Sequence, residues 1–187
     1  LSRVGREYAS MVRGLGARDV LAHDPFTAPQ DAAEFGVELV DLAQLCERSD
    51  VLAIHAPVTD ETRGMLDAGL LARLRDGAIV VNTARSAVID MEALTAELVS
   101  GRLRAGLDVF DVEPLPADSP LYGLDNVVLT PHVAGGTVEA RFAQGAGVVD
   151  EVTAFLAGRD AQVIGEYREI ESGRKSDRQQ LAAAMNM

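Results

Sequence analysis

The most restrictive feature of this 187-residue sequence is a repeated alternation between short apolar runs and longer segments with helical periodicity. The apolar runs are rich in leucine and β-branched residues and contain few charges, which is typical of strands buried on both faces. The longer segments place apolar residues three and four positions apart and have Gly or Ser near their ends. The predicted strands cover 19–24, 50–57, 78–84, 104–110 and 126–132, and the predicted helices cover 2–16, 40–49, 67–77 and 91–102.

Strands that alternate with helices are joined by right-handed crossovers. The pattern therefore predicts an α/β fold with a doubly wound parallel sheet that is covered by helices on both sides. No internal repeat or low-complexity linker interrupts it. Because the periodicity weakens after Gly158, we expect residues 1–158 to form one domain and residues 159–187 to form a peripheral helix or a partly disordered tail.

Composition excludes several classes of function. The chain has 17 basic and 29 acidic residues, and this net charge of -12 argues against binding to nucleic acid or to an anionic membrane. A single cysteine, Cys46, rules out an internal disulfide, and three scattered histidines form no zinc ligand set, so we expect no metal site. No apolar run reaches the roughly 18 residues of a membrane span, and a reducing cytoplasm fits this composition.

The first residues resemble part of a glycine-rich turn. If a glycine preceded Leu1, the segment that ends at Gly5 would read G-x-S-x-x-G and would open a helix, as at the pyrophosphate site of dinucleotide-binding folds. Asp24 ends the next predicted strand, nineteen positions after Gly5, close to the spacing of the acid that binds the adenosine ribose. Such a carboxylate favours NAD over NADP. The alternative is that Asp24, followed by Pro25, only begins a turn.

Polar residues follow three later strands at the edge where open α/β sheets bind ligands. Arg85 follows the strand 78–84, and its planar guanidinium suits a carboxylate. Glu113 lies in the loop after Asp108, and His132 ends the segment "LTPH". A histidine here can move a proton near neutral pH, and a nearby glutamate would orient it and favour its protonated form. The alternatives are a surface arginine in a salt bridge and a histidine in a surface loop.

The segment "HAPVTDETRGML" has a simpler reading. Pro57 ends a strand, and Thr59 is placed to cap a helix that Asp60 and Glu61 begin. His55, at the end of the strand, is expected to pack near a cofactor, or simply to pack against the core.

These motifs occur in one order along the chain: "SRVGRE", "HDP", "HAPVTDETRGML", "VVNTARSAVID", "GLDVFDVEPLPADSPL" and "NVVLTPHVAGG". In that order and at these spacings the chain resembles the NAD-binding domain of the D-isomer-specific 2-hydroxyacid dehydrogenases, from Leu1 to about Gly158. The resemblance implies a Rossmann-type domain and an NAD-dependent oxidoreductase that interconverts a D-2-hydroxy acid and its 2-keto acid by hydride transfer. It also implies a homodimer for the full-length protein.

The same resemblance assigns roles to individual residues. It implies that Arg85 binds the substrate carboxylate, that His132 is the acid and base, and that Glu113 supports the histidine. It places Ser2, Arg3 and Val4 at the pyrophosphate turn, Asp24 at the adenosine ribose and Asp108 at the nicotinamide carboxamide. The full set of implied cofactor contacts is Ser2, Arg3, Val4, Gly5, Asp24, His55, Pro57, Thr62, Thr83, Ala84, Asp108, His132 and Gly135.

Two departures from the family pattern affect these expectations. Ser86 stands where the family has glycine, which would cost something if that position needs a positive φ or close approach to the ligand. Roughly a hundred residues that build most of the substrate domain are also absent, together with the first strand of the sheet, and the tail after Gly158 is the candidate for a helix that returns to that domain. Two alternative functions remain open, an NAD(H)-sensing binding module that resembles the corepressors of the family and an inactive truncated remnant.

Overall fold

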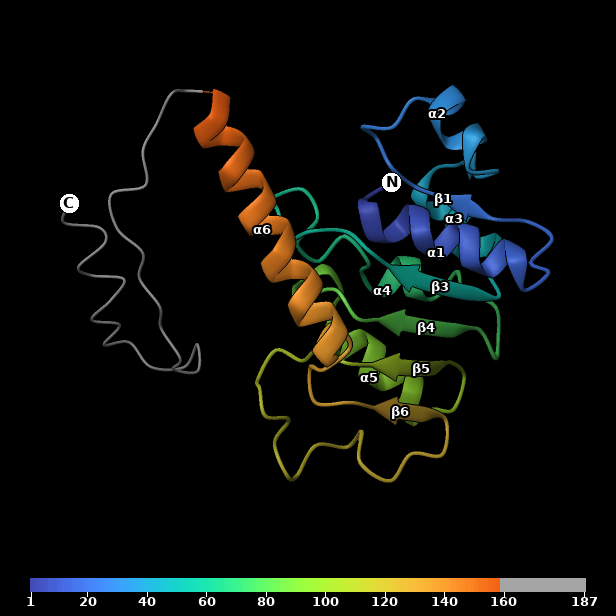
Figure 1. The fold of residues 1–187 in the computed structure, drawn as a ribbon. Helices are drawn as coiled ribbons and strands as arrows, with labels where there is room; N and C mark the ends of the chain where they lie inside the picture. The colour runs from blue at the N-terminus through green and yellow to red at the C-terminus, as the bar shows by residue number, and fades with distance from the viewer. Residues whose placement is uncertain (159–187) are drawn as a thin grey trace. The chain divides into compact units, whose positions relative to one another are not determined.

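The computed structural model describes residues 1–158, which belong to two compact units (Figure 1). The first unit is Leu1–Gly136 and contains every strand of the described chain. The second unit begins at Thr137, and its described part is helix α6 (Val138–Gly158). The tail predicted for residues 159–187 lies outside the described residues.

The strands of the first unit form two parallel sheets. Four of them lie side by side in the order β3 (Val51–Ile54), β4 (Ile79–Asn82), β5 (Arg104–Leu107) and β6 (Val127–Leu129) (Figure 1). Strand β1 (Leu21–Ala22) pairs with β2 (Glu38–Leu39) in a separate two-stranded sheet. Every one of these pairs is parallel, which confirms the predicted α/β class.

Helices precede β1 and separate most consecutive strands, and all but the second of them were predicted. They are α1 (Arg3–Gly14), α2 (Pro29–Glu34), α3 (Leu42–Arg48), α4 (Ala68–Leu71) and α5 (Met91–Val99). Four of them begin at a side-chain cap, in which an oxygen of Ser2, Asp41, Asp67 or Asp90 accepts a hydrogen bond from a backbone N–H three residues later. These caps satisfy donors that the first helical turn leaves unpaired.

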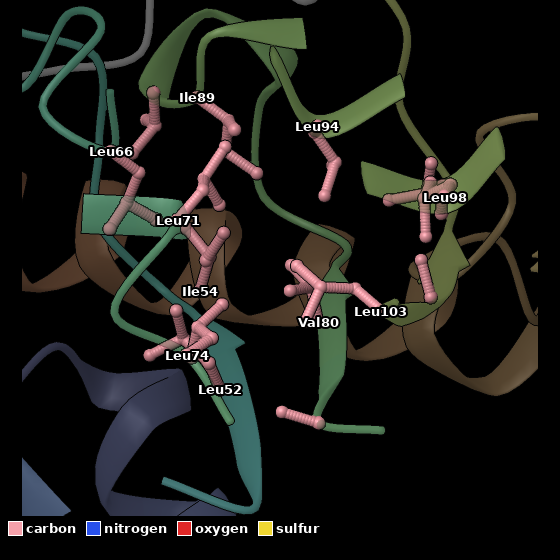
Figure 2. Close-up of a cluster of buried hydrophobic side chains, with 14 of the residues drawn as sticks. Leu52, Ile54, Leu66, Leu71, Leu74, Val80, Ile89, Leu94, Leu98 and Leu103 are labelled. Atoms are coloured by element: carbon pink, nitrogen blue, oxygen red, sulfur yellow. The ribbon is translucent and has the colours of Figure 1, made fainter. Parts of the chain in front are cut away.

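The main hydrophobic core fills one face of the four-stranded sheet. Leu52, Ile54 and Val80 project from the strands and pack with residues of the helices and loops that cover them, including Leu71 and Leu94 (Figure 2). A second, smaller cluster of Ala9, Ala32 and Val37 lies beside β1 and β2. The division of the strands into two sheets is therefore matched by a division of the core.

Burial on both faces of the strands was expected, and it holds for one face only. Alternate residues of β3, β4 and β5 are buried, whereas the residues between them, such as Ala53, Val81 and Gly106, are partly exposed. On β6 the exposed fraction of Val128 is 67%. Two of the residues on the open face, Ala53 and Gly106, are also small, so they have little apolar surface to bury.

The segment after β3 corrects one expected element. Residues 60–64 form a turn, although a helix was expected to begin at Asp60. The Thr59 hydroxyl does accept a hydrogen bond from the backbone N–H of Thr62, at 3.3 Å, but this contact stabilises the turn. The turn ends at Gly64, whose φ of +62° is accessible to glycine at little cost.

Three further differences concern the length of one helix and the presence of elements that were not predicted. Helix α4 ends at Leu71, although 67–77 was predicted as helical. The pair formed by α2 and β2 was not predicted, and neither was α6. Within the described part of the chain, no helix is both long enough and apolar enough to cross a membrane.

The Asn126 side chain stabilises the edge of the sheet at which the strands begin. The Asn126 amide donates hydrogen bonds to the carbonyls of Leu98, at 2.9 Å, and Leu103, at 2.7 Å. These bonds join the start of β6 to the end of α5 and to the segment before β5. Asn126 therefore supports the packing at the edge opposite to the one where the candidate site residues lie.

Candidate functional site

The carboxyl ends of β4, β5 and β6 lie next to one another because these strands are neighbours in a parallel sheet. The residues predicted as a catalytic set follow these three ends: Arg85 follows β4, Glu113 follows β5 and His132 follows β6. This is the edge at which open α/β sheets bind ligands.

The structure brings His132 and Glu113 into direct contact. Their side chains are joined by a hydrogen bond of 2.8 Å between Nδ1 and Oε2. A carboxylate only accepts, so Nδ1 carries the proton, and Nε2 is the nitrogen available to a substrate. The hydrogen bond from His132 and a second one from the backbone N–H of Phe110, at 3.1 Å, hold the pKa of Glu113 below its usual range.

The backbone at His132 has a φ of +56°, and among the described residues it is the only non-glycine residue with a positive φ. Histidine enters this left-handed region more often than most residues, but at some cost. The loop around His132 must therefore be held by other contacts.

Asp108 supplies those contacts. Its carboxylate is 2% exposed and accepts three hydrogen bonds from the loop after β6. The donors are the hydroxyl of Thr130, at 2.6 Å, and the backbone N–H groups of Val133, at 2.9 Å, and Ala134, at 3.0 Å. Burial by itself raises the pKa of Asp108, but these three bonds outweigh it and leave the pKa lowered. Asp108 is thus an ionised anchor for the loop that carries His132.

Arg85 follows β4 at the same edge of the sheet but is not bonded to this pair. Its guanidinium donates to the carbonyl of Ala84 at 2.6 Å, and no hydrogen bond or ion pair joins it to Glu113 or His132. The side chain is exposed, and a guanidinium in that position is open to a carboxylate from solution.

Ser86 does not have the positive φ that would favour glycine at this position. It begins the short 3-10 helix η1 (Ser86–Val88), and its φ is not positive. The serine therefore adds no backbone strain at this position.

The predicted pyrophosphate residues form the first turn of α1. The Ser2 hydroxyl caps the helix by accepting from the N–H of Gly5 at 3.1 Å, and Gly5 is buried. Arg3 and Val4 are exposed, and the first turn has no acidic residue. A helix N-terminus of this kind attracts anions.

Asp24 lies just after β1. Its Oδ1 accepts from the backbone N–H of Phe26 at 2.9 Å, and its Oδ2 lies against the backbone nitrogen of Leu1. Asp24 is thus at a strand end near the start of α1, where its carboxylate also shapes the turn that follows.

His55 packs under the first turn of α1. Its ring lies 5.0 Å from the ring of Tyr8, and a Cβ added at Gly5 would lie 3.7 Å from the Cβ of His55. Within the described residues, Nε2 of His55 is buried and has no hydrogen-bond partner. Burial lowers the pKa of His55, so the ring is neutral near pH 7.

A hydrogen bond between Thr62 and Pro57 closes a small loop. The Thr62 hydroxyl donates to the carbonyl of Pro57 at 2.6 Å and accepts from the N–H of Thr59 at 2.8 Å. The only hydroxyl proton of Thr62 is therefore already used within the loop.

The remaining predicted contacts lie around the same edge. Thr83 is exposed, Ala84 is half-buried and Gly135 lies in the exposed loop after His132. Among residues 1–158, no group of three or more His, Cys, Asp or Glu side chains is arranged to hold a metal ion.

Asn82 was not among the predicted site residues. It is the last residue of β4, it is completely buried, and its side-chain amide binds the backbone of the Arg85 loop. A signal was present in the sequence, because Asn82 occupies the same face of the strand as buried Val80. A polar residue at such a position needs a specific hydrogen-bond partner.

This chain is similar to known proteins of one family. Residues 1–134 match the family model described as "D-isomer specific 2-hydroxyacid dehydrogenase, NAD binding domain". The D-3-phosphoglycerate dehydrogenase of Mycobacterium leprae is 43% identical over 159 residues, and the glyoxylate reductase of Korarchaeum cryptofilum is 40% identical over 159 residues. Each match covers 84% of this chain.

This chain is also similar to a solved structure. The crystal structure of the TT0316 protein from Thermus thermophilus matches with a TM-score of 0.73 and 36% identity, over 84% of this chain and 49% of that one. This chain spans 30% of the length of the Mycobacterium leprae protein and 48% of the Korarchaeum cryptofilum protein.

Proposed function

Because this chain belongs to the D-isomer-specific 2-hydroxyacid dehydrogenase family through its NAD-binding domain, we propose that it is the cofactor-binding part of an NAD-dependent oxidoreductase. The proposed reaction interconverts a D-2-hydroxy acid and its 2-keto acid. The observation that carries the proposal is the hydrogen-bonded pair of His132 and Glu113 at the carboxyl edge of the sheet, where Arg85 also follows a strand.

In this proposal Arg85 and His132 act on the substrate, and Glu113 acts on His132. Arg85 binds the carboxylate with its planar guanidinium. His132 gives a proton from Nε2 to the carbonyl oxygen during reduction and takes it from the hydroxyl during oxidation. Glu113 fixes the ring through Nδ1 and stabilises the positive charge of the protonated imidazole.

The residues at the first turn of α1 fit a dinucleotide. The backbone N–H groups of Arg3 and Val4, the Arg3 side chain and the absence of acidic residues from this turn suit a pyrophosphate. Asp24 suits the ribose hydroxyls, and His55, whose Nε2 has no partner among the described residues, packs against Gly5 in this turn. When bound, the cofactor supplies the hydride for reduction of C2 or accepts it in the reverse direction.

We further propose that residues 1–158 are the NAD-binding domain of a longer protein. The separation of β1 and β2 from the other strands supports this idea, because one further parallel strand between β1 and β3 would join the two sheets into one. The homodimer implied by the resemblance also stays a prediction, which light scattering on the full-length protein would check.

The test is turnover of a panel of 2-keto acids by the full-length protein with NADH, followed by the variants Arg85→Ala and His132→Asn. Asparagine is chosen because it also tolerates a positive φ. Both variants should lose at least about a thousandfold in kcat/KM, as expected when an acid/base or a carboxylate anchor is removed, while the Kd for NADH stays within about twofold.

A matched control is Arg75→Ala. Arg75 is an exposed arginine that pairs with Asp50 before β3 and β4 begin, and its loss should leave turnover unchanged. Unchanged turnover in Arg85→Ala or His132→Asn would reject the assignment. Tight NADH binding without reduction of any keto acid would instead favour the NAD(H)-sensing module.

A further inference from the structure

Asn82 makes two hydrogen bonds that are directed to a single loop. Its Oδ1 accepts from the backbone N–H of Ala84 at 3.0 Å, and its Nδ2 donates to the backbone carbonyl of Arg85 at 3.0 Å. The side chain is 0% exposed, so it exchanges neither bond with water. One amide thus binds the backbone of the Arg85 loop at two points.

These bonds begin where the sheet stops. The ladder between β4 and β5 ends with the N–H of Asp108 donating to the carbonyl of Asn82 at 3.0 Å. Beyond this point the chain leaves β4, and the polar groups of Ala84 and Arg85 need other partners. The Asn82 side chain supplies the partners of the Ala84 N–H and the Arg85 carbonyl, so the loop keeps a fixed path from the rigid strand to Arg85.

We propose that Asn82 is a positioning residue that holds the backbone of Arg85 so that its guanidinium meets the substrate carboxylate. This inference rests on the proposed function, since it assumes that Arg85 binds that carboxylate. Arg85 itself is long and exposed, and its side chain has many accessible rotamers. A fixed backbone therefore limits where the guanidinium can go, which is the part of the geometry that the protein can set in advance.

The chemistry of an amide matches this task. The Arg85 loop presents one N–H and one C=O, and asparagine offers one acceptor and one donor in the same plane. Aspartate would keep the acceptor for Ala84, but it would place a second oxygen against the carbonyl of Arg85. Alanine would remove both bonds. The two substitutions therefore separate loss of one contact from loss of both.

The experiment compares Asn82→Asp and Asn82→Ala with a matched control, Asn126→Asp, in the full-length protein. Asn126 also donates two hydrogen bonds to backbone carbonyls, but it lies at the opposite edge of the sheet. The readouts are the KM for the keto acid, kcat, the Kd for NADH and the melting temperature.

If Asn82 positions Arg85, both Asn82 variants raise the KM for the keto acid by about tenfold or more, the effect expected for a lost buried hydrogen bond. The Kd for NADH stays within about twofold. Asn126→Asp lowers the melting temperature but leaves KM unchanged. Should either Asn82 variant fail to fold, the other carries the test, because Asn82→Ala buries no charge and Asn82→Asp keeps the side-chain shape and the Ala84 bond.

A double-mutant cycle with Arg85→Ala completes the design. If Asn82 acts through Arg85, then Asn82→Asp has no further effect on KM in the Arg85→Ala background. An unchanged KM in Asn82→Asp, or an equal effect of Asn82→Asp with and without Arg85, overturns the inference. Failure of the proposed function has a different signature, because Arg85→Ala by itself would then keep full kcat/KM.

Discussion

Replacing Asp108 with asparagine should release the loop that carries His132 while leaving the sheet intact. The substitution keeps the shape of the side chain and one acceptor oxygen, but it turns the other oxygen into an N–H donor. That donor would face an N–H group of Val133 or Ala134, both of which now donate to the carboxylate. The loop would therefore lose one bond completely, and the other two would lose their charge.

The magnitude follows from these contacts. A buried N–H left unpaired costs about 1–3 kcal/mol, and the loss of charge weakens each remaining bond by roughly 0.5–1 kcal/mol. Because Asp108 is 2% exposed, water compensates little of this cost. The total is about 3 kcal/mol, which corresponds to about a hundredfold change in the equilibrium for opening of the loop.

Amide hydrogen exchange measures this opening directly. The amides of Val133 and Ala134 should exchange about a hundredfold faster in Asp108→Asn, whereas amides in β4 and β5 should keep their rates. Thr130→Val removes only the hydroxyl bond to Asp108 and should accelerate the same amides by about tenfold or less. If the Val133 and Ala134 rates in Asp108→Asn stay within about twofold of the wild-type rates, Asp108 does not hold the loop.

Acid should have the same effect as the substitution. The pKa values of Asp108 and Glu113 are lowered in the folded protein, so the stabilisation from both carboxylates is complete above their usual range near pH 4. It is lost as the pH falls through the lowered values. Loop amides should therefore lose protection only below about pH 4, and in Asp108→Asn this pH dependence should shrink. Loss of protection at neutral pH would contradict the assignment.

Three more predictions concern other parts of the chain. Gly36→Ala and Gly77→Ala should each destabilise the protein by about 1 kcal/mol in urea denaturation, because their φ values are +64° and +81°; the Arg13 guanidinium beside Gly36 is the end of a flexible side chain and can move aside, so a much larger cost at Gly36 would contradict this reasoning. Cys46 should resist Ellman's reagent at pH 8 until the protein unfolds, because burial raises the pKa of its thiol to about 11, and rapid native-state labelling would contradict this. Asp24→Ser should improve the ratio of NADPH to NADH affinity by about tenfold in fluorescence titrations, since a carboxylate repels the 2′-phosphate; an unchanged ratio would place the ribose elsewhere.

The sequence predicts the sheet well because its strands are continuous apolar runs. The runs around Leu52, Val80 and Leu107 stand out from the polar segments beside them, and each is a strand in the structure. The position of His132 after one strand and of Glu113 after the next also follows from the rule that parallel strands end at one edge. The contact between these two side chains agrees with that reasoning.

Other features of the fold and the site depend on contacts that cannot be predicted from the spacing of apolar residues. Strand β2 has two residues, which is too short for any repeat, and it exists because β1 offers it a parallel partner. The turn after Thr59 carries the capping contact of a helix, but its residues have no apolar face to bury against the core. Asn82 lies only three residues before Arg85, but its role could not be predicted from the sequence. Its hydrogen-bond partners are backbone groups, and every residue has these groups.

The order of the strands in the larger sheet has a consequence for synthesis on the ribosome. The order β3-β4-β5-β6 in space is also the order along the chain. Each strand can therefore join the edge left by the strand made just before it, and no earlier pair has to open to admit a later one. Parallel pairing closes long loops, which slows folding, but here every closure spans a single crossover. Until β6 emerges, the outer edge of β5 is the growing end of the sheet, so a pause in synthesis between Leu107 and Val127 leaves an unpaired strand edge exposed to aggregation.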